Sequence, residues 1–506
     1  MVHAAGRNVL FVVLDTARKD HLTPYGYDVA TTPILESFAE EALVYEQAVT
    51  QAPWTLPAHA SMFTGRYPSE HTATQESPYL PEDVGTLAQA LSMAGYRTAC
   101  FSSNAWITPY TRLTAGFDEH GSFFEALPGG SLSSVAAALW RRLSDGRLRP
   151  LADRLVEFGN TIHERLAARG ADSKTPAVLD RTRGFIDETD DQWFAFVNLM
   201  DAHLPYYPPE AYRAEFAPGV DPGAVCQNSK VYNSGARSVS EAEFESIRRL
   251  YDAEIRHMDA ELGRLFEYLR QSGQWEETVV IVCADHGELH GEFDLYGHEF
   301  AVYDPLVNVP LLVKHPDLGT GRTGRTVELL DLYDTVLESA AALDAPDRVG
   351  GRRFEPERSL CSDEREISDP KCGFVEYRRP VIEQRQLRTK AKKAGVEIDE
   401  RSRFGSRMCA VRRPDAMYIH NERIPDEAYR LDGGHDRLPA VPETIDPDGE
   451  VAAELSAALS RFSMRVGSIC GSNISSPNRD RQVTVDETIS EMDDATRRRL
   501  RDLGYL

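Results

Sequence analysis

The segment 52–68 combines a helix start with residues that could do nucleophilic chemistry. Thr55 is a residue type that often caps a helix, Pro57 is tolerated only in a first helical turn, and Gly65 is a typical helix stop. A helix that begins at Thr55 would place its hydroxyl beside free backbone N–H groups, which favour an anion or an ionised nucleophile. His59 lies four residues later, on the same helix face. A simple capping role for Thr55 is the alternative.

Three apolar runs end close to side chains that could bind a metal or a substrate. They are rich in β-branched and aromatic residues, as expected of strands buried on both faces of a parallel sheet. These runs cover residues 8–14, 194–200 and 278–284. Asp15 follows the first run, His203 comes shortly after the second, and Asp285 and His286 follow the third. Because ligands of open α/β sheets lie beyond the carboxyl ends of strands, we expect these residues to share one edge. Capping the next helix is the alternative role for Asp15.

Two adjacent metal-competent side chains are a stronger signal than one histidine. Asp285 and His286 form such a pair, and Gly287 permits a tight turn behind them. His298 could face the same cleft, although a surface-loop histidine is an equally good interpretation. Asn104 follows another predicted strand and is a further candidate for this edge.

Helical patterns separate the predicted strands. Apolar residues recur at helical spacing in 33–42, 84–95 and 241–272. Residues 131–190 show the same spacing among many arginines, which favours a helical insertion packed on the sheet. A lid, a membrane-surface helix and a partner-binding helix are the alternatives. The alternation of strands and helices predicts an α/β domain over residues 1–345.

The pattern changes after about residue 345. Short strand-like pieces at 373–377, 408–411 and 416–419 predict hairpins in a smaller C-terminal α+β domain, residues 346–506. The basic segment 378–407 could contact an anionic substrate or a membrane surface, and a solvated loop is the simpler expectation.

The composition restricts the class of partner. The chain has 506 residues and a formal net charge of −24, which disfavours nucleic acid as a ligand. It contains 8 Lys and 48 Arg. This acidic, Lys-poor composition fits either adaptation to concentrated salt or a GC-rich genome.

The cysteines and the N-terminus favour a cytoplasmic protein. The seven cysteines are odd in number and include no C-x-x-C pair, so neither a disulfide framework nor a zinc ribbon is expected. The first residues contain no signal-peptide pattern, and no apolar run is long enough to span a membrane. Nothing in the sequence fixes an oligomeric state.

Several ordered blocks resemble the sulfatase branch of the alkaline phosphatase superfamily. They cover residues 8–20, 55–68, 251–255, 285–288, 297–298 and 503–506. The resemblance extends over residues 8–345. It implies an alkaline phosphatase-like fold, in which helices sandwich a large, parallel-rich mixed sheet and a small C-terminal domain contains an antiparallel sheet.

The resemblance also implies roles for individual residues. By position, Asp15, Asp285 and His286 resemble the family's metal ligands, and Thr55 occupies the position of the nucleophile, which also contacts the metal. His203 and His298 resemble residues that bind the transferred group or protonate the leaving oxygen, with Asn104 a weaker candidate for substrate binding.

The expected catalytic residues are therefore Thr55, His59, His203 and His298. One divalent ion is expected, Mn²⁺, Mg²⁺, Ca²⁺ or Zn²⁺, with mixed O/N ligation slightly favouring Mn²⁺ or Zn²⁺. Asp201, with His203 and His298, leaves a second metal site open.

Three positions depart from the family pattern. Thr16 stands where many members have a further acid or amide, Thr55 replaces the Cys or Ser that is oxidised to formylglycine, and His59 replaces an Arg. Oxidation of Thr would give a ketone instead of an aldehyde, so formylglycine is not expected. A plain threonine alkoxide favours phosphate or phosphonate esters over sulfate esters.

Two other functions remain open at this stage. The chain could hydrolyse sulfuric esters without formylglycine, or it could be a catalytically inactive, anion-binding module. Retention of Asp15, Asp285 and His286 favours an enzyme, because an inactive site needs no metal ligands. By family analogy, the anionic ester would be linked to a glycan or a lipid.

Overall fold

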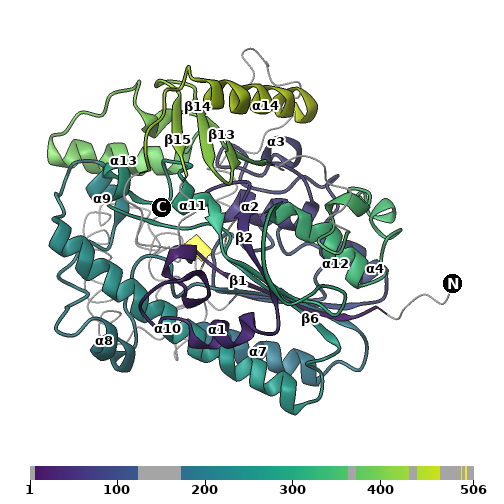
Figure 1. Ribbon diagram of the computed structural model, residues 1–506. Coiled ribbons are helices and arrows are strands. Elements are labelled where there is room, and N and C mark those ends of the chain that lie inside the picture. The colour runs from purple at the N-terminus through teal and green to yellow at the C-terminus, as the bar shows by residue number, and fades with distance from the viewer. Residues whose placement is uncertain are drawn as a thin grey trace, which may run out of the picture.

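A large central sheet with helices on both faces forms the body of the molecule, and a smaller sheet lies at one end (Figure 1). The computed structural model describes residues 6–122, 173–362, 372–431 and 442–467, together with 492, 496 and 497. The predicted insertion at 131–190 is described only from residue 173, where Thr175–Asp187 forms helix α7. Its earlier part lies outside the described residues.

The large sheet has the order β11-β2-β10-β6-β1-β5-β3-β4, with the short β9 paired to β2. Neighbouring strands are parallel except at β9 and β10, so the sheet is mixed and parallel-rich, as predicted. The strands are β1 (Asn8–Leu14), β2 (Leu43–Val49), β3 (Arg97–Ser102), β4 (Glu119–Ser122), β5 (Trp193–Leu199), β6 (Thr278–Cys283), β9 (Asn308–Val309), β10 (Leu311–Lys314) and β11 (Gly321–Glu328).

The three apolar runs predicted as buried strands are the centre of this sheet. β1 lies between β5 and β6, with Leu14 opposite Leu199 and Val13 opposite Cys283. Because these parallel strands end at the same level, the residues that follow them meet at one edge. Further along the chain, β9 and β10 are separated at Pro310, which lacks the N–H that a continuous ladder needs.

Helices cover both faces of the sheet (Figure 1). One layer contains α1 (Pro33–Ala39), α7 and the long α10 (Glu241–Gln271), and the other contains α2 (Thr55–Thr64), α4 (Leu87–Met93) and α12 (Leu332–Ser339). The Ser240 hydroxyl caps α10 by accepting a hydrogen bond from the Glu243 N–H. Shorter helices are α3 (Pro68–His71), α8 (Glu210–Phe216), α9 (Ser229–Asn233) and α11 (Asp304–Val307). A two-stranded ribbon, β7 (Leu289–His290) and β8 (Tyr296–Gly297), follows β6.

The C-terminal part contains the predicted antiparallel sheet. Its strands are β12 (Gly373–Tyr377), β13 (Met408–Arg413), β14 (Ala416–Asn421) and β15 (Glu427–Arg430), and α14 (Glu450–Val466) packs on it. The expectation of a solvated loop over 378–407 is wrong, because α13 (Val381–Ala394) lies within it and packs against α9. The charged residues hid three buried apolar positions at roughly helical spacing, Ile382, Leu387 and Ala391.

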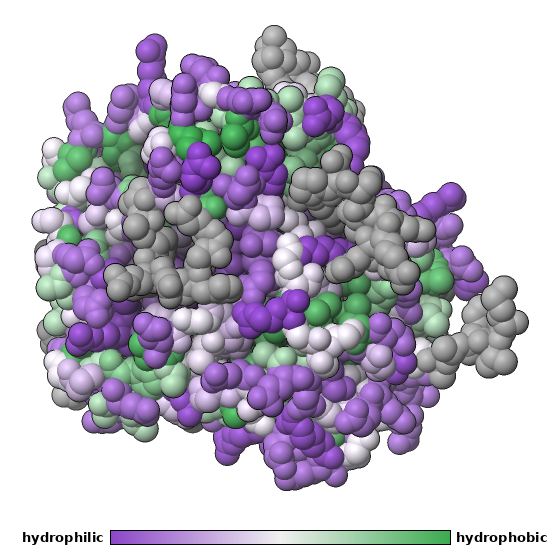
Figure 2. Space-filling view, in the orientation of Figure 1, coloured by the Kyte–Doolittle hydropathy of each residue, from purple (hydrophilic) through white to green (hydrophobic). Residues whose placement is uncertain are grey.

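Figure 2 shows mostly hydrophilic side chains over the visible face, with hydrophobic residues in small groups. Within the described ranges, no helix is both long and apolar enough to cross a bilayer. Cys409 is disulfide-bonded, whereas the cysteine pattern predicted no disulfide framework.

Candidate active site

Thr55 is the first residue of α2, and its hydroxyl is not a cap. The N-cap is Trp54, in an extended conformation, so the predicted start is displaced by one residue. The Thr55 Oγ instead accepts a hydrogen bond of 3.2 Å from Nδ2 of Asn104. Gly65 ends the helix at φ 64°, a left-handed conformation that glycine adopts without strain. The simple capping interpretation of Thr55 is therefore excluded.

Three residues predicted to bind a metal come together at the carboxyl edge of β1 and β6. Asp15, Asp285 and His286 each offer one ligand atom, and these three atoms lie within 4.8 Å of one another. All three side chains are fully buried. Asp15 Oδ1, Asp285 Oδ2 and His286 Nε2 have no hydrogen-bond partner. Buried polar atoms without partners are costly, so this cluster has unused capacity for a cation.

Asp15 is oriented by two amides. Its Oδ2 atom accepts hydrogen bonds from Nδ2 of Asn104 at 2.7 Å and from Nδ2 of Asn198 at 3.0 Å. Asn104 thus connects the Asp15 carboxylate to the Thr55 hydroxyl. The predicted substrate-binding residue Asn104 is therefore part of the site, where its side chain joins the nucleophile position to a metal-ligand position.

The backbone orients Asp285 and His286. Asp285 Oδ1 accepts from the N–H groups of Thr16 at 3.2 Å and His286 at 3.0 Å, and Nδ1 of His286 lies 3.0 Å from the Gly287 carbonyl oxygen. A Cβ atom at Gly287 would lie 1.9 Å from the carbonyl oxygen of Pro305. Only glycine fits this close approach, so Gly287 is needed for packing as well as for the turn.

The electrostatics of the cluster fit a bound cation. Burial, followed by the charge of Asp285, raises the pKa of Asp15 to about 7, and burial raises the pKa of Asp285 to about 7. Burial lowers the pKa of His286 to about 4, which keeps its imidazole neutral and able to coordinate. Two carboxylate oxygens and one imidazole nitrogen are a donor set that suits a divalent metal with mixed O/N ligation.

Thr16 is not available as a further ligand. Its φ of 58° is unusual for a β-branched residue and turns its N–H toward Asp285. Its hydroxyl lies 2.7 Å from the Asp15 carbonyl oxygen and 2.6 Å from that of Ala202, and can donate to only one of them at a time. The departure from the family pattern at this position therefore removes an acidic ligand from the site.

His59, four residues after Thr55 on α2, lies next to the cluster. Its Nδ1 atom lies 2.9 Å from the Thr55 carbonyl oxygen and 3.6 Å from Asp285 Oδ2. The ring packs edge-on against Phe196. Burial lowers the pKa of His59 to about 3, so this residue does not supply the positive charge of the family's arginine.

His203 and His298 lie beside His286. The ring centroids of His298 and His286 are 4.4 Å apart, and those of His298 and His203 are 5.4 Å apart. Nδ1 of His298 is 3.1 Å from Glu288 Oε1. Nδ1 of His203 is 2.5 Å from the carbonyl oxygen of Leu204. Every predicted site residue is thus brought to the same edge of the sheet.

Asn198 and Glu288 are site residues that the sequence analysis did not single out. A signal was present for each: Asn198 is the one polar residue inside the apolar run 194–200, and Glu288 follows directly after the Asp285-His286-Gly287 turn. Asp201 does not join the site, because its carboxylate is bonded to Ser173, Thr175 and His257. Among the described residues, the Asp15 cluster is the one group with metal-site geometry, so the second metal site is not supported.

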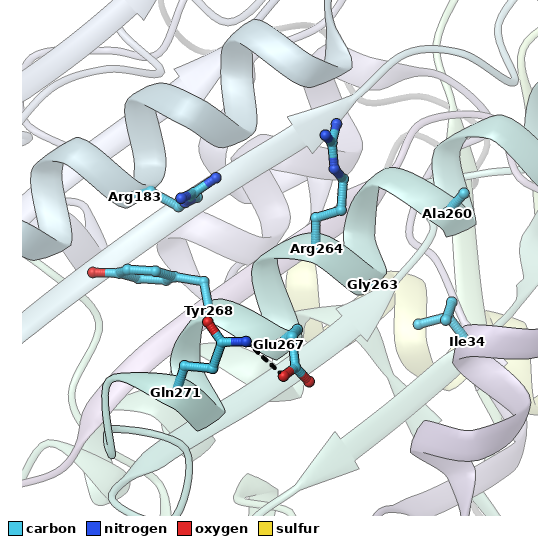
Figure 3. A pocket seen from close by; sticks show the side chains of 8 residues that line it. All are labelled: Ile34, Arg183, Ala260, Gly263, Arg264, Glu267, Tyr268 and Gln271. Atoms are coloured by element: carbon cyan, nitrogen blue, oxygen red, sulfur yellow. Dashed lines mark hydrogen bonds between the residues drawn. The ribbon is translucent and has the colours of Figure 1, made fainter.

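A groove elsewhere on the molecule is unrelated to this chemistry. It encloses about 320 Å³ between α1, α7 and α10 (Figure 3). It lies along the later part of α10, from Ala260 to Gln271, whereas the hydroxyl of Tyr251, earlier on the same helix, contacts the Thr16 carbonyl oxygen at the site. Its cations are already engaged: Arg264 pairs with Glu261, and Arg183 stacks on Tyr268.

Comparisons with known proteins agree with this geometry. The sequence model of the Sulfatase family matches residues 7–342. The chain is 25% identical over 361 residues to the ulvan-active sulfatase of Formosa agariphila, covering 68% of this chain but only 63% of that protein. It is 26% identical over 407 residues to the multifunctional alkaline phosphatase superfamily protein PehA of Trinickia caryophylli, covering 69% of this chain and 76% of the relative.

Solved structures show the same fold. The phosphonate monoester hydrolase SpPMH from Silicibacter pomeroyi superimposes with a TM-score of 0.62 at 19% identity, covering 91% of this chain and 95% of that one. The family match, the fold and the cluster at the strand ends thus agree with one another. The chain belongs to the Sulfatase family of the alkaline phosphatase superfamily.

Proposed function

We propose that this protein is a metal-dependent hydrolase of singly charged phosphorus esters, such as phosphodiesters and phosphonate monoesters, with Thr55 as its nucleophile. The observation that carries the proposal is the environment of the Thr55 hydroxyl. It lies at the N-terminus of α2, has no capping role, and is held by Asn104, which also binds the metal-ligand candidate Asp15.

The proposed reaction has two displacements. Thr55, having lost its hydroxyl proton to solvent, attacks phosphorus, and the bond between phosphorus and the leaving oxygen breaks. The leaving oxygen takes a proton from a histidine of the site, His203 or His298. Water then attacks the phosphothreonine, returns a proton to that histidine and releases Thr55.

Asp15, Asp285 and His286 would hold the divalent ion, with the Thr55 oxygen next to it. When bound, the ion would lower the pKa of the Thr55 hydroxyl and stabilise negative charge in the transition state. Asn104 and Asn198 keep Asp15 in place for this role, and Thr16 does the same for Asp285.

Phosphorus esters are favoured because threonine cannot form the aldehyde that sulfatases use. A hydrated aldehyde can eliminate sulfate after transfer, whereas a sulfothreonine has no such route. A phosphothreonine is cleaved by direct attack of water at phosphorus. One relative is, by its name, a sulfatase active on ulvan. Esters linked to a glycan or a lipid stay among the candidate substrates by family analogy.

The charges around the site favour a singly charged ester. Arg18, close to the site, is paired with Asp20 and Glu292. Lys230 is paired with Glu299 and with Glu383, at 3.0 Å from the latter. Position 59, where the resemblance implies an arginine, is a histidine in this chain. With both buried cations neutralised, the site provides less compensation for a doubly charged phosphate monoester.

The test is turnover of four aryl esters with added Mn²⁺: a phosphodiester, a methylphosphonate, a phosphate monoester and a sulfate. We expect the first two to react fastest and Thr55→Ala to abolish turnover, with a phosphorylated Thr55 peptide detectable by mass spectrometry in the parent protein. Turnover of the sulfate alone would support the sulfatase alternative. A folded protein that turns over none of the four and takes up no metal would support the anion-binding module.

A further inference from the structure

We propose that Glu288 is a positioning residue that orients His298 for proton transfer to the leaving group, an inference that rests on the proposed function. Glu288 ends the Asp285-His286-Gly287 turn, and its side chain is fully buried. Its Oε1 atom lies 3.1 Å from Nδ1 of His298. Because Nδ1 of His298 faces the Glu288 side chain, Nε2 is the ring nitrogen left to exchange a proton with substrate.

Arg18 forms no ion pair with the Glu288 side chain. The Arg18 guanidinium is fully buried near Glu288, but its Nη1 atom donates to the backbone carbonyl of Glu288 at 3.1 Å and to Glu292 at 2.7 Å. Its other contacts are to Asp20. The Oε2 atom of Glu288 has no hydrogen-bond partner.

Lys230 is the second buried cation of this region and is also engaged elsewhere. It forms ion pairs with Glu299, which directly follows His298 in the sequence, and with Glu383 of α13. His298 is therefore the side chain that the described structure provides as a partner for the Glu288 carboxylate. A buried carboxyl group in contact with one imidazole nitrogen fixes the orientation of that histidine ring.

The contrast with His203 assigns different roles to the two histidines. Nδ1 of His203 faces the carbonyl oxygen of Leu204, a neutral acceptor that orients the ring but adds little stabilisation to an imidazolium. Nδ1 of His298 faces a carboxylate. His298 is thus the proton donor to the leaving oxygen, and His203 is a hydrogen-bonding residue for the transferred group.

The step is balanced as follows. When Thr55 Oγ bonds to phosphorus, the electron pair of the breaking bond goes to the leaving oxygen, which takes the proton from Nε2 of His298. The imidazole becomes neutral and keeps its Nδ1–H on Glu288. The attacking water of the second displacement restores the Nε2 proton.

The test measures how Glu288→Gln changes turnover of aryl methylphosphonates whose phenols range from dinitrophenol to unsubstituted phenol. An amide stabilises the imidazolium less and also permits the other tautomer. We expect kcat/KM to fall about 100-fold for phenol and less than about 3-fold for dinitrophenol, whose oxygen needs no proton.

Two controls separate positioning from a structural role. Glu376→Gln makes the same change in another buried glutamate, whose carboxylate accepts from the Ser69 N–H, and it should leave the leaving-group dependence unchanged. In a His298→Ala background, Glu288→Gln should cost less than about 3-fold for every ester, because its effect passes through the missing imidazole.

An equal loss for all leaving groups, or a full additional loss in the His298→Ala background, would overturn the role of Glu288. Those results would leave the proposed function intact if Thr55→Ala still abolishes turnover. A parent protein that turns over none of these esters would overturn the proposed function, and this inference with it.

Discussion

In the described structure, the ends of β5 and β6 each carry an aspartate whose side chain is buried close to a histidine, and the two ends differ in which polar atoms lack a hydrogen-bond partner. After β5, both oxygens of Asp201 are bonded, Oδ1 to Ser173 at 2.5 Å and to His257 at 3.0 Å, and Oδ2 to Thr175. After β6, Asp285 Oδ2 and His286 Nε2 have no hydrogen-bond partner. The Asp201 carboxylate is therefore fully hydrogen-bonded, whereas Asp285 and His286 each keep an atom that could bind a metal.

The comparison shows that residue type, burial and position at a strand end do not by themselves identify a site. Asp201 and Asp285 share a residue type, a buried side chain and a place at a strand end, but among the described residues only Asp285 belongs to a group of three whose ligand atoms lie within 4.8 Å of one another. Unmet bonding capacity is thus the feature that separates a candidate metal site from a packing contact. Four predictions test or sharpen this distinction, from the largest expected effect to the smallest.

The largest effect is expected at Asp285. Asp285→Asn keeps the shape but removes the charge, so loss of metal stabilisation of the transition state should lower kcat/KM at least about 1,000-fold. Metal content measured by elemental analysis should fall in parallel. Near-normal metal content and activity in this variant would show that the cluster at β6 is as structural as that at β5.

Asn198→Ala should weaken metal binding without abolishing it. The amide of Asn198 donates to Asp15 Oδ2 at 3.0 Å, and loss of such a supporting contact costs about 10- to 100-fold in metal affinity. Titration with Mn²⁺ followed by calorimetry gives the affinity. At saturating metal, kcat should recover to near the parent value, and a kcat that stays low would instead place Asn198 in direct contact with substrate.

Metal affinity should rise with pH and level off near neutrality. The pKa values of Asp15 and Asp285 are raised to about 7 in the metal-free protein, so below that pH a binding cation must displace protons. The pKa of His286 is lowered to about 4, so above that pH this residue has no proton to release when the metal binds. Calorimetry in two buffers should show proton release at pH 6 and affinity falling about tenfold or more per pH unit below 7. A pH-independent affinity would contradict the ligand assignment.

The smallest effect on activity is expected at Asp201. Asp201→Asn weakens the hydrogen bonds to Ser173, Thr175 and His257, so the free energy of unfolding should fall by about 1–3 kcal/mol. Activity at saturating metal should change less than about threefold at a temperature where the variant is folded. A loss as large as that of Asp285→Asn would make Asp201 part of the catalytic machinery.

Much of the sheet could be predicted because buried parallel strands have a simple pattern. The runs predicted at 8–14, 194–200 and 278–284 are β1, β5 and β6, with ends displaced by at most one residue. α13 was not predicted because its three buried apolar positions are interspersed with many charged residues. The N-cap of α2 was predicted at Thr55 but is Trp54, because Trp54 takes the extended conformation and Thr55 is already helical. The boundary at residues 345 and 346 remains a prediction.

The sequence alone determined which side chains stand at the strand ends, since strand termination by Asp15, Asp285 and His286 is a local property of the chain. Tertiary structure alone decided which of them are left without partners. Asp201 is bonded to groups from α7 and α10, whereas Asp15 and Asp285, which follow neighbouring strands, each keep one oxygen without a hydrogen-bond partner. Strand register and helix packing fix these neighbours, and they join residues far apart in the sequence, so a linear pattern cannot reveal which polar atoms stay available for chemistry.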